Sequence, residues 1–152
     1  MSPRVGCAVL AAGASRRLGH PKQLARHRGE PLVRLAAGCG CQSRAVATAV
    51  VVGAHAGAVH AALHELPVEI VPNPDWQQGL AASIRAASAW AERHALDALL
   101  LALCDQPRLT SAHLDRLIAE FERTGLAVAS YYAQKSGSPR YFRGLRGPPW
   151  RP

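Results

Sequence analysis

Three polar segments of the sequence carry residue types that suit chemistry on phosphate groups. The first, residues 10–22, reads LAAGASRRLGHPK and combines small residues with two arginines and a lysine. Small residues let backbone N–H groups approach an anion closely, and arginine and lysine bind phosphate oxygens directly. The spacing matches neither the dinucleotide-binding fingerprint nor the Walker loop. The segment therefore predicts another kind of anion-binding loop, with a plain Gly/Arg turn after a buried strand as the alternative.

The second segment, residues 73–83, reads NPDWQQGLAAS. Gly79 is expected to open a helix, and the helix N-terminus with nearby Ser83 suits an anion or a ribose hydroxyl. Asn73 has the amide needed to hydrogen-bond a base or a sugar. The alternative, which the residue types favour equally, is ordinary helix capping by Asp75, Gln77 and Ser83.

The third segment, residues 104–107, places Asp105 at the end of the most apolar stretch of the chain. Mg²⁺ usually takes one or two protein carboxylates together with phosphate oxygens and water. Asp105 is therefore our candidate for holding Mg²⁺ against a triphosphate. The alternative is that Asp105 caps the turn that follows it.

The apolar pattern alternates between short runs typical of buried strands and longer runs with helical spacing. This alternation predicts an α/β domain whose parallel sheet is covered by helices on both faces. In such sheets the ligand site lies at the carboxyl ends of the strands, and each polar segment follows a predicted strand. The predicted strands are Val5–Ala11, Ala45–Val52, Val68–Val71, Leu96–Leu103 and Ala127–Tyr132. The predicted helices begin at Pro31, run from Ala56 to Glu65 and from Gly79 to about His94, and follow an N-cap at Thr110.

The bulk properties fit one domain that binds an anionic partner. The chain has 152 residues and a net charge of +8, which suits nucleotides, nucleic acid or phospholipid. The arginines are spread along the chain and form no stripe, which argues against a nucleic-acid binder. No apolar run is long enough to span a membrane. The four cysteines lack the spacing of a zinc site, so we expect a reduced, cytoplasmic protein without a membrane partner.

Together the three segments resemble the molybdenum cofactor nucleotidyltransferases, the MobA-like NTP transferase family. They match L-A-A-G-x-S-x-R-x-G-x-x-K, N-x-x-W-x-x-G-L-x-x-S-I and D-Q-P, in that order. The resemblance runs from about Val5 to Phe142, so we expect residues 1–142 to form one domain and residues 143–152 to form an irregular tail. It implies a Rossmann-like three-layer α/β/α nucleotidyltransferase fold with a mostly parallel sheet. It also implies Mg²⁺-dependent attack of an acceptor phosphate on the α-phosphorus of an NTP, with release of pyrophosphate.

The resemblance also implies roles for single residues. Arg17 and Lys22 would neutralise the triphosphate and, with the metal ligand Asp105, form the catalytic set. The nucleotide would be bound by Leu10, Ala11, Ala12, Gly13, Arg17, Lys22, Asn73, Gly79 and Ser83. In the family, Ala-Ala-Gly at the start of the loop goes with cytidine, so the expected substrate is CTP. The expected acceptor is a phosphorylated pterin, the molybdenum cofactor, docked beside Gly79 and Ser83, and the expected protein partner is a molybdoenzyme or its maturation chaperone.

Transfer of this kind needs positioning and charge rather than a covalent nucleophile. We therefore assign no catalytic role to Cys104 or to any histidine.

The chain departs from the family pattern near its C-terminus. The family's later G-D-x-G-A-R element, which supplies a second metal-binding Asp, has no counterpart here. Our hypothesis at this point is a truncated or frame-shifted C-terminus. Two alternatives stay open: transfer of a nucleotide to a sugar or isoprenoid phosphate, and a non-catalytic chaperone that retains affinity for a nucleotide or pterin.

Overall fold

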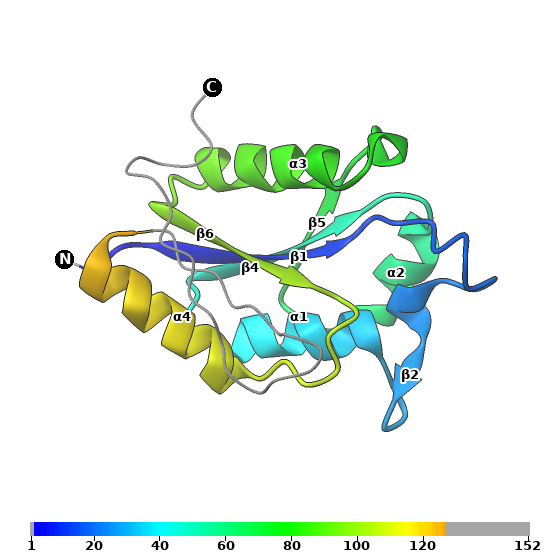
Figure 1. Ribbon diagram of the computed structural model, residues 1–152, viewed down its shortest axis with the longest axis horizontal. Coiled ribbons are helices and arrows are strands. Elements are labelled where there is room, and N and C mark those ends of the chain that lie inside the picture. The colour runs from blue at the N-terminus through cyan, green and yellow to red at the C-terminus, as the bar shows by residue number, and fades with distance from the viewer. Residues whose placement is uncertain (1, 127–152) are drawn as a thin grey trace.

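The computed structural model describes residues 2–126, and in this range four parallel strands form one sheet with the order β5-β4-β1-β6 (Figure 1). The strands are β1 (Val5–Ala11), β4 (Ala47–Val52), β5 (Glu69–Pro72) and β6 (Ala98–Leu103). The register pairs Ala8 of β1 with Ala49 on one side and with Leu101 on the other. A parallel sheet is therefore confirmed. The predicted strand Ala127–Tyr132 lies outside the described residues.

Helices cover both faces of this sheet (Figure 1). Helix α3 (Leu80–Arg93) packs on one face, and α1 (Leu32–Gln42), α2 (Ala56–Ala62) and α4 (Ser111–Thr124) contribute to the core on the other. Two single 3-10 turns, η1 (Lys22–Leu24) and η2 (Trp76–Gln78), and a small antiparallel pair, β2 (Arg26–His27) and β3 (Glu30–Pro31), complete the described elements. The three-layer Rossmann-like arrangement expected from the sequence is confirmed.

Strand β1 lies at the centre of the core because its side chains are apolar on both faces. All seven of its residues are buried. Cys7 and Val9 point into the layer of α1 and α4, whereas Ala8 and Leu10 point into the layer of α3. On the α3 side, the small alanines of the sheet leave room for the fully buried Trp90. One large aromatic over small residues fills a core that has few aromatics.

Most element boundaries fall close to those predicted, and the departures have local causes. Thr110 is the N-cap of α4, and its side chain accepts a hydrogen bond from the backbone N–H of His113 at 3.1 Å. Helix α2 ends at Ala62 rather than Glu65, which has a φ of 67°. Leu96 was predicted to begin a strand, but its N–H bonds to Ala91 O at the end of α3. No helix within residues 2–126 is both long and apolar enough to cross a lipid bilayer.

Candidate functional site

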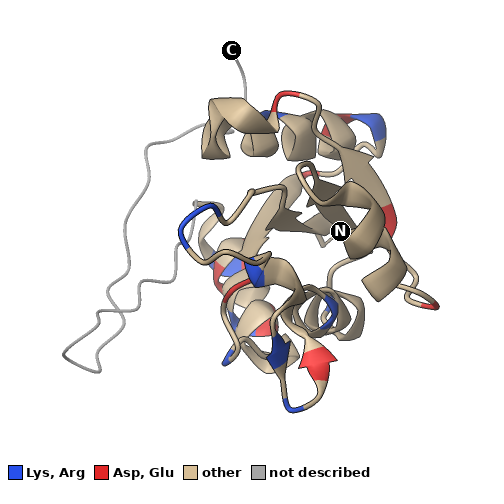
Figure 2. Ribbon diagram, turned by 90° about the vertical axis from the view of Figure 1, so that its right-hand side faces the viewer, with Lys and Arg blue, Asp and Glu red and all other residues tan. Residues whose placement is uncertain are grey.

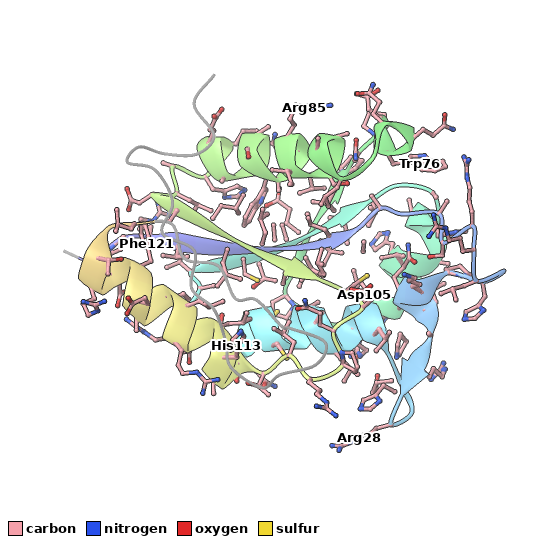
Figure 3. All side chains as sticks on the ribbon, in the orientation of Figure 1. Arg28, Trp76, Arg85, Asp105, His113 and Phe121 are labelled. Carbon is pink, nitrogen blue, oxygen red and sulfur yellow. The ribbon has the colours of Figure 1, made fainter. Side chains whose placement is uncertain are left out.

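The loops that follow the strands meet at one end of the sheet, as the sequence predicts. In Figure 1 this is the end toward which the arrows of β1 and β6 point. The segments are residues 12–21 after β1, 53–55 after β4, 73–79 after β5 and 104–110 after β6. Trp76 and Asp105, labelled in Figure 3, belong to two of these loops. All three chemistry-bearing segments therefore lie at the carboxyl end of the sheet.

The buried side chain of Gln23 holds the loop after β1 by hydrogen bonds to its carbonyl oxygens. The Gln23 Nε2 amide donates to the carbonyl oxygens of Ala11 at 3.0 Å and of Gly13 at 2.8 Å. Its Oε1 accepts from the hydroxyl of Ser15 at 3.3 Å, and the Ser15 Oγ accepts the N–H of Lys22 at 2.9 Å. Gln23 is only 2% exposed, so this network is an internal support of the loop.

The loop after β4 holds the same segment from another direction. The N–H of Ala54 donates to Ala12 O at 3.2 Å, and Nε2 of His55 lies 3.2 Å from Ala14 O. Together with the contacts of Gln23, these bonds engage every carbonyl from residue 11 to residue 14. The carbonyl side of the loop is therefore fully used within the protein.

The amide side of this loop is not used in the same way. Among residues 2–126, no acceptor receives the backbone N–H groups of residues 13–17. A Cβ built on Gly13 would meet no described atom within 4 Å, so the outer side of the loop is open. Consecutive N–H groups without internal acceptors are well suited to bind an anion.

Gly53 is required where the loops after β1, β4 and β5 come together. A Cβ at this position would lie 2.6 Å from Cβ of Trp76 and 2.7 Å from the backbone oxygen of Ala12. Both distances are shorter than van der Waals contact, and one of them involves rigid backbone. The absence of a side chain at Gly53 therefore allows the loops to pack against one another.

The structure brings the first and third segments together through Lys22 and Asp105. Lys22 Nζ lies 3.8 Å from Asp105 Oδ2, and the side chains are 50% and 43% exposed. An ion pair this exposed contributes little to stability. Both charged groups remain accessible to a ligand, so the pair brings the lysine predicted to bind phosphate next to the carboxylate predicted to bind a metal ion.

Arg17 of the first segment lies in the exposed part of the loop. Neither Arg17 nor its neighbour Arg16 has a hydrogen-bond or ion-pair partner within the described part of the chain. Figure 2 views this end and shows lysine and arginine in the loop and in the β2–β3 hairpin, with Arg28 near the hairpin's tip (Figure 3). The carboxyl end of the sheet therefore presents two arginines, Arg16 and Arg17, whose charge is not offset by any residue between 2 and 126.

Cys104 precedes Asp105 but is poorly suited to act as a nucleophile. Burial raises the pKa of its thiol to about 11, and the nearby Asp105 carboxylate contributes in the same direction. The thiol is therefore protonated near neutral pH. A protonated thiol is consistent with the prediction that Cys104 is not the catalytic group.

Two polar side chains of the second segment, those of Asn73 and Ser83, are used internally. Asn73 and Ser83 are 4% and 5% exposed, and Asn73 Nδ2 donates to Ser83 Oγ at 3.1 Å. Asn73 Oδ1 accepts the N–H of Asp75 at 3.1 Å. These bonds fasten the end of β5 to the start of α3. The backbone at Gly79 is exposed, and its φ of 93° favours glycine.

Helix α3 begins at Leu80 with Gly79 as its N-cap, as predicted, and no side-chain cap bond is made there or at η2. The alternative of ordinary capping by Asp75, Gln77 and Ser83 is therefore not what the described residues adopt.

Two residues of the site received no role from sequence reasoning, Gln23 and His55. Gln23 follows Lys22 directly, and that position is the only signal in the sequence that points to it. His55 comes just after a strand, but nothing in the sequence indicates its contact with Ala14. Within residues 2–126, no group of three His, Cys, Asp or Glu side chains is arranged to hold a metal ion.

Comparison with known proteins identifies the family of the chain. Residues 7–149 match the model of the MobA-like NTP transferase domain. The chain belongs to this family. It is 38% identical over 148 residues to nicotine blue oxidoreductase of Paenarthrobacter nicotinovorans, covering 97% of this chain and 70% of that protein.

Solved structures support the assignment. Rv0371c from Mycobacterium tuberculosis H37Rv superposes with a TM-score of 0.73 at 32% identity, covering 94% of this chain and 72% of that one. The same protein in complex with manganese gives a TM-score of 0.68 at 30% identity, covering 92% and 71%. A CMP:2-keto-3-deoxy-manno-octonic acid synthetase complexed with CTP shares the fold, with a TM-score of 0.67 at 15% identity, covering 84% and 51%. The protein is therefore a nucleotidyltransferase of the MobA-like type.

Proposed function

We propose that this protein transfers CMP from CTP to the phosphate of a molybdenum-cofactor-type pterin and releases pyrophosphate. One observation carries the proposal. Lys22 Nζ lies 3.8 Å from the carboxylate of Asp105, beside a loop whose N–H groups from residue 13 to 17 have no acceptor in the described chain. In this arrangement the N–H groups and the lysine would bind the oxygens of a triphosphate, and the carboxylate would bind its metal ion.

Asp105 fits a magnesium ion because its carboxylate is a hard oxygen ligand and is half exposed. One protein carboxylate is sufficient when phosphate oxygens and water complete the shell. Such an ion, when bound, would draw charge from the α- and β-phosphates. That a Rv0371c structure contains manganese supports a divalent cation in this family.

The residues of the chain would provide binding and charge rather than a covalent intermediate. The loop N–H groups and Arg17 would hold phosphate oxygens, and Lys22 would offset the negative charge that grows on the departing pyrophosphate. The acceptor phosphate oxygen would attack the α-phosphorus directly. The chemistry then depends on holding the two phosphates in line.

The base and the acceptor rest on the family's pattern rather than on contacts. The side chains of Leu10, Ala11 and Ala12 are buried, so these residues and Gly13 would meet a base through their backbone, and the Ala-Ala-Gly order is the reason for choosing CTP. The acceptor would dock near Gly79, where exposed backbone at the start of α3 favours a phosphate. Asn73 and Ser83 would act by fixing that helix start. A molybdoenzyme or its maturation chaperone would receive the product.

A second candidate follows from the name of one relative. Nicotine blue oxidoreductase is 38% identical over 97% of this chain. An oxidoreductase on this scaffold would use the same loop for the diphosphate of a dinucleotide. The Lys22–Asp105 pair favours the transferase, because a metal-binding carboxylate beside the loop has no evident use in binding a dinucleotide.

Calorimetric titration with CTP, GTP and NADH, with and without Mg²⁺, tests the proposal. We expect Mg²⁺-dependent CTP binding that Asp105→Ala weakens by about tenfold or more. Asp97→Ala is the matched control, because Asp97 bonds to the backbone N–H of Arg4 at the opposite end of the sheet. Pyrophosphate release with a phosphorylated pterin, compared with a sugar phosphate, then identifies the acceptor class. The proposed transferase function is rejected if CTP does not bind, or if the affinity for CTP changes neither with Mg²⁺ nor with Asp105→Ala. NADH binding in its place favours the oxidoreductase.

A further inference from the structure

Gln23 uses its side-chain amide entirely for hydrogen bonds inside the protein, and it is too deeply buried to contact a bound phosphate. Gln23 is 2% exposed and lies beneath the loop after β1. We propose that Gln23 is a positioning residue that sets the shape of this loop and, through it, the affinity for the triphosphate. The inference rests on the proposed nucleotide-binding function of the loop.

The contacts of Gln23 use the full capacity of its amide. Both hydrogens of Nε2 are donated, one to Ala11 O at 3.0 Å and one to Gly13 O at 2.8 Å. Among uncharged side chains only an amide carries two hydrogens on one nitrogen together with an acceptor oxygen. Without these donors, two carbonyls packed beneath the loop would lose their partners, which favours a different loop shape.

The amide oxygen of Gln23 is connected to the backbone of Lys22 through the hydroxyl of Ser15. Gln23 Oε1 accepts from Ser15, and Ser15 Oγ in turn accepts the backbone N–H of Lys22 at 2.9 Å. Ser15 has a φ of 55°, a conformation that side-chain-bearing residues rarely adopt unless other bonds hold them there. The network therefore connects the start of the loop to the lysine whose Nζ lies 3.8 Å from Asp105.

A conservative substitution separates the hydrogen bonds of Gln23 from its volume. Gln23→Met keeps the length of the side chain and removes both donors. Thr48→Val is the matched control, because Thr48 is also a buried polar residue, at 6% exposed, but lies in β4 beside Gly40 and away from the loop. Both changes remove buried polar groups, so a merely structural effect should be common to both.

The first measurement is a double-mutant cycle on CTP affinity in the presence of Mg²⁺. We expect Gln23→Met to weaken CTP binding by about tenfold, and we expect its effect not to add to that of Lys22→Ala, since both changes act on the same contact. Thr48→Val should leave CTP affinity unchanged, and its effect should add to that of Lys22→Ala. The inference is overturned if Gln23→Met binds CTP with wild-type affinity. It is also overturned if the effects of Gln23→Met and Lys22→Ala on CTP affinity are additive, as expected for Thr48→Val and Lys22→Ala.

The second measurement does not depend on a nucleotide. The N–H groups of Leu18 and Lys22 both bond to Ser15. Their hydrogen exchange in the free protein should accelerate in Gln23→Met and remain unchanged in Thr48→Val. Unchanged exchange there overturns the positioning role even if the wild type binds no CTP, a result that would by itself reject only the proposed function. If Gln23→Met does not fold, Ser15→Ala interrupts the same network nearer the surface and is expected to change exchange and affinity in the same direction.

Discussion

The two ends of the parallel sheet use polar groups in opposite ways. At the amino end, Trp90 Nε1 and His94 Nε2 both lie 2.8 Å from the Glu69 carboxylate. Beside them the backbone N–H of Arg4 donates to Asp97 at 2.7 Å, and the Arg4 guanidinium donates to the His94 carbonyl at 3.2 Å. These groups fasten the start of the strands to the end of α3, so the polar groups at this end serve the fold.

At the carboxyl end, the groups that suit a ligand are left available. The N–H groups of residues 13–17 have no acceptor within residues 2–126, and Arg17 has no partner in that range. Lys22 and Asp105 are about half exposed. The buried polar groups, such as Gln23, support the loop from the inside.

The contrast shows how one sheet separates stability from function. Strands of a parallel sheet bring all their carboxyl ends to one edge, so uncompensated charge there can serve a ligand. Charged groups without partners contribute nothing to stability, so the stability of the fold comes from the amino end of the sheet and from the core. Substitutions matched between the two ends therefore test the division.

The largest effect is expected from adding a methyl group where backbone packs closely. Gly53→Ala places a Cβ 2.7 Å from Ala12 O at the carboxyl end, and Gly6→Ala places one against Leu96 and the Trp90 ring at the amino end. Each should lower the free energy of unfolding by about 1–3 kcal/mol, measured with urea. Only Gly53→Ala should also weaken CTP binding, because it displaces the loop after β1, which we propose to bind the nucleotide. Equal CTP affinity in the two variants would remove the functional side of the comparison.

A smaller effect is expected when an arginine is removed from each end. Arg17→Ala should change the free energy of unfolding by less than about 0.5 kcal/mol and weaken CTP binding by about tenfold, since a charge-assisted phosphate contact is lost. Arg4→Ala should do the opposite, lowering the free energy of unfolding by about 0.5–1.5 kcal/mol with CTP affinity unchanged. Thermal unfolding and calorimetric titration of the two proteins measure both quantities. A loss of stability in Arg17→Ala would mean that Arg17 has a structural role.

Much of this arrangement could be predicted because it follows from local patterns. Val5–Ala11 reads as a strand because its residues are apolar without alternation, and it is buried on both faces. The meeting of Lys22 and Asp105 follows from the rule that loops after parallel strands gather at one edge. Thr110 was identifiable as an N-cap from its type and position.

The parts that could not be predicted depend on contacts between distant segments or on conformations without a sequence signal. The bonds of Gln23 exist only once the loop has folded over it. The pairing of Asn73 with Ser83 could not be distinguished from capping, because the same residue types serve both. The β2–β3 hairpin turns through Arg28, with a φ of 52°, and Gly29. Arginine is not a residue that signals such a turn.

The smallest effect concerns Cys7, in the strand that joins the two ends. Burial raises the pKa of its thiol to about 12, and Cys41 and Cys39 contribute in the same direction. Below pH 9, the thiol is protonated in both the folded and the unfolded chain, so it adds no pH dependence. Between pH 9 and 12 only the unfolded chain releases the proton, so stability falls as the pH rises through this window.

Cys7→Ala should lower stability at every pH, because it leaves a cavity, but it should make the fall above pH 9 less steep. The difference amounts to no more than about 1 kcal/mol between pH 9 and 10, since at most one proton is involved. Urea unfolding of both proteins at a series of pH values measures the two slopes, and CTP affinity at pH 7 should be the same in both. Parallel slopes would show that the Cys7 thiol titrates alike in the two states, and a change in CTP affinity would show that the centre of β1 is coupled to the carboxyl end.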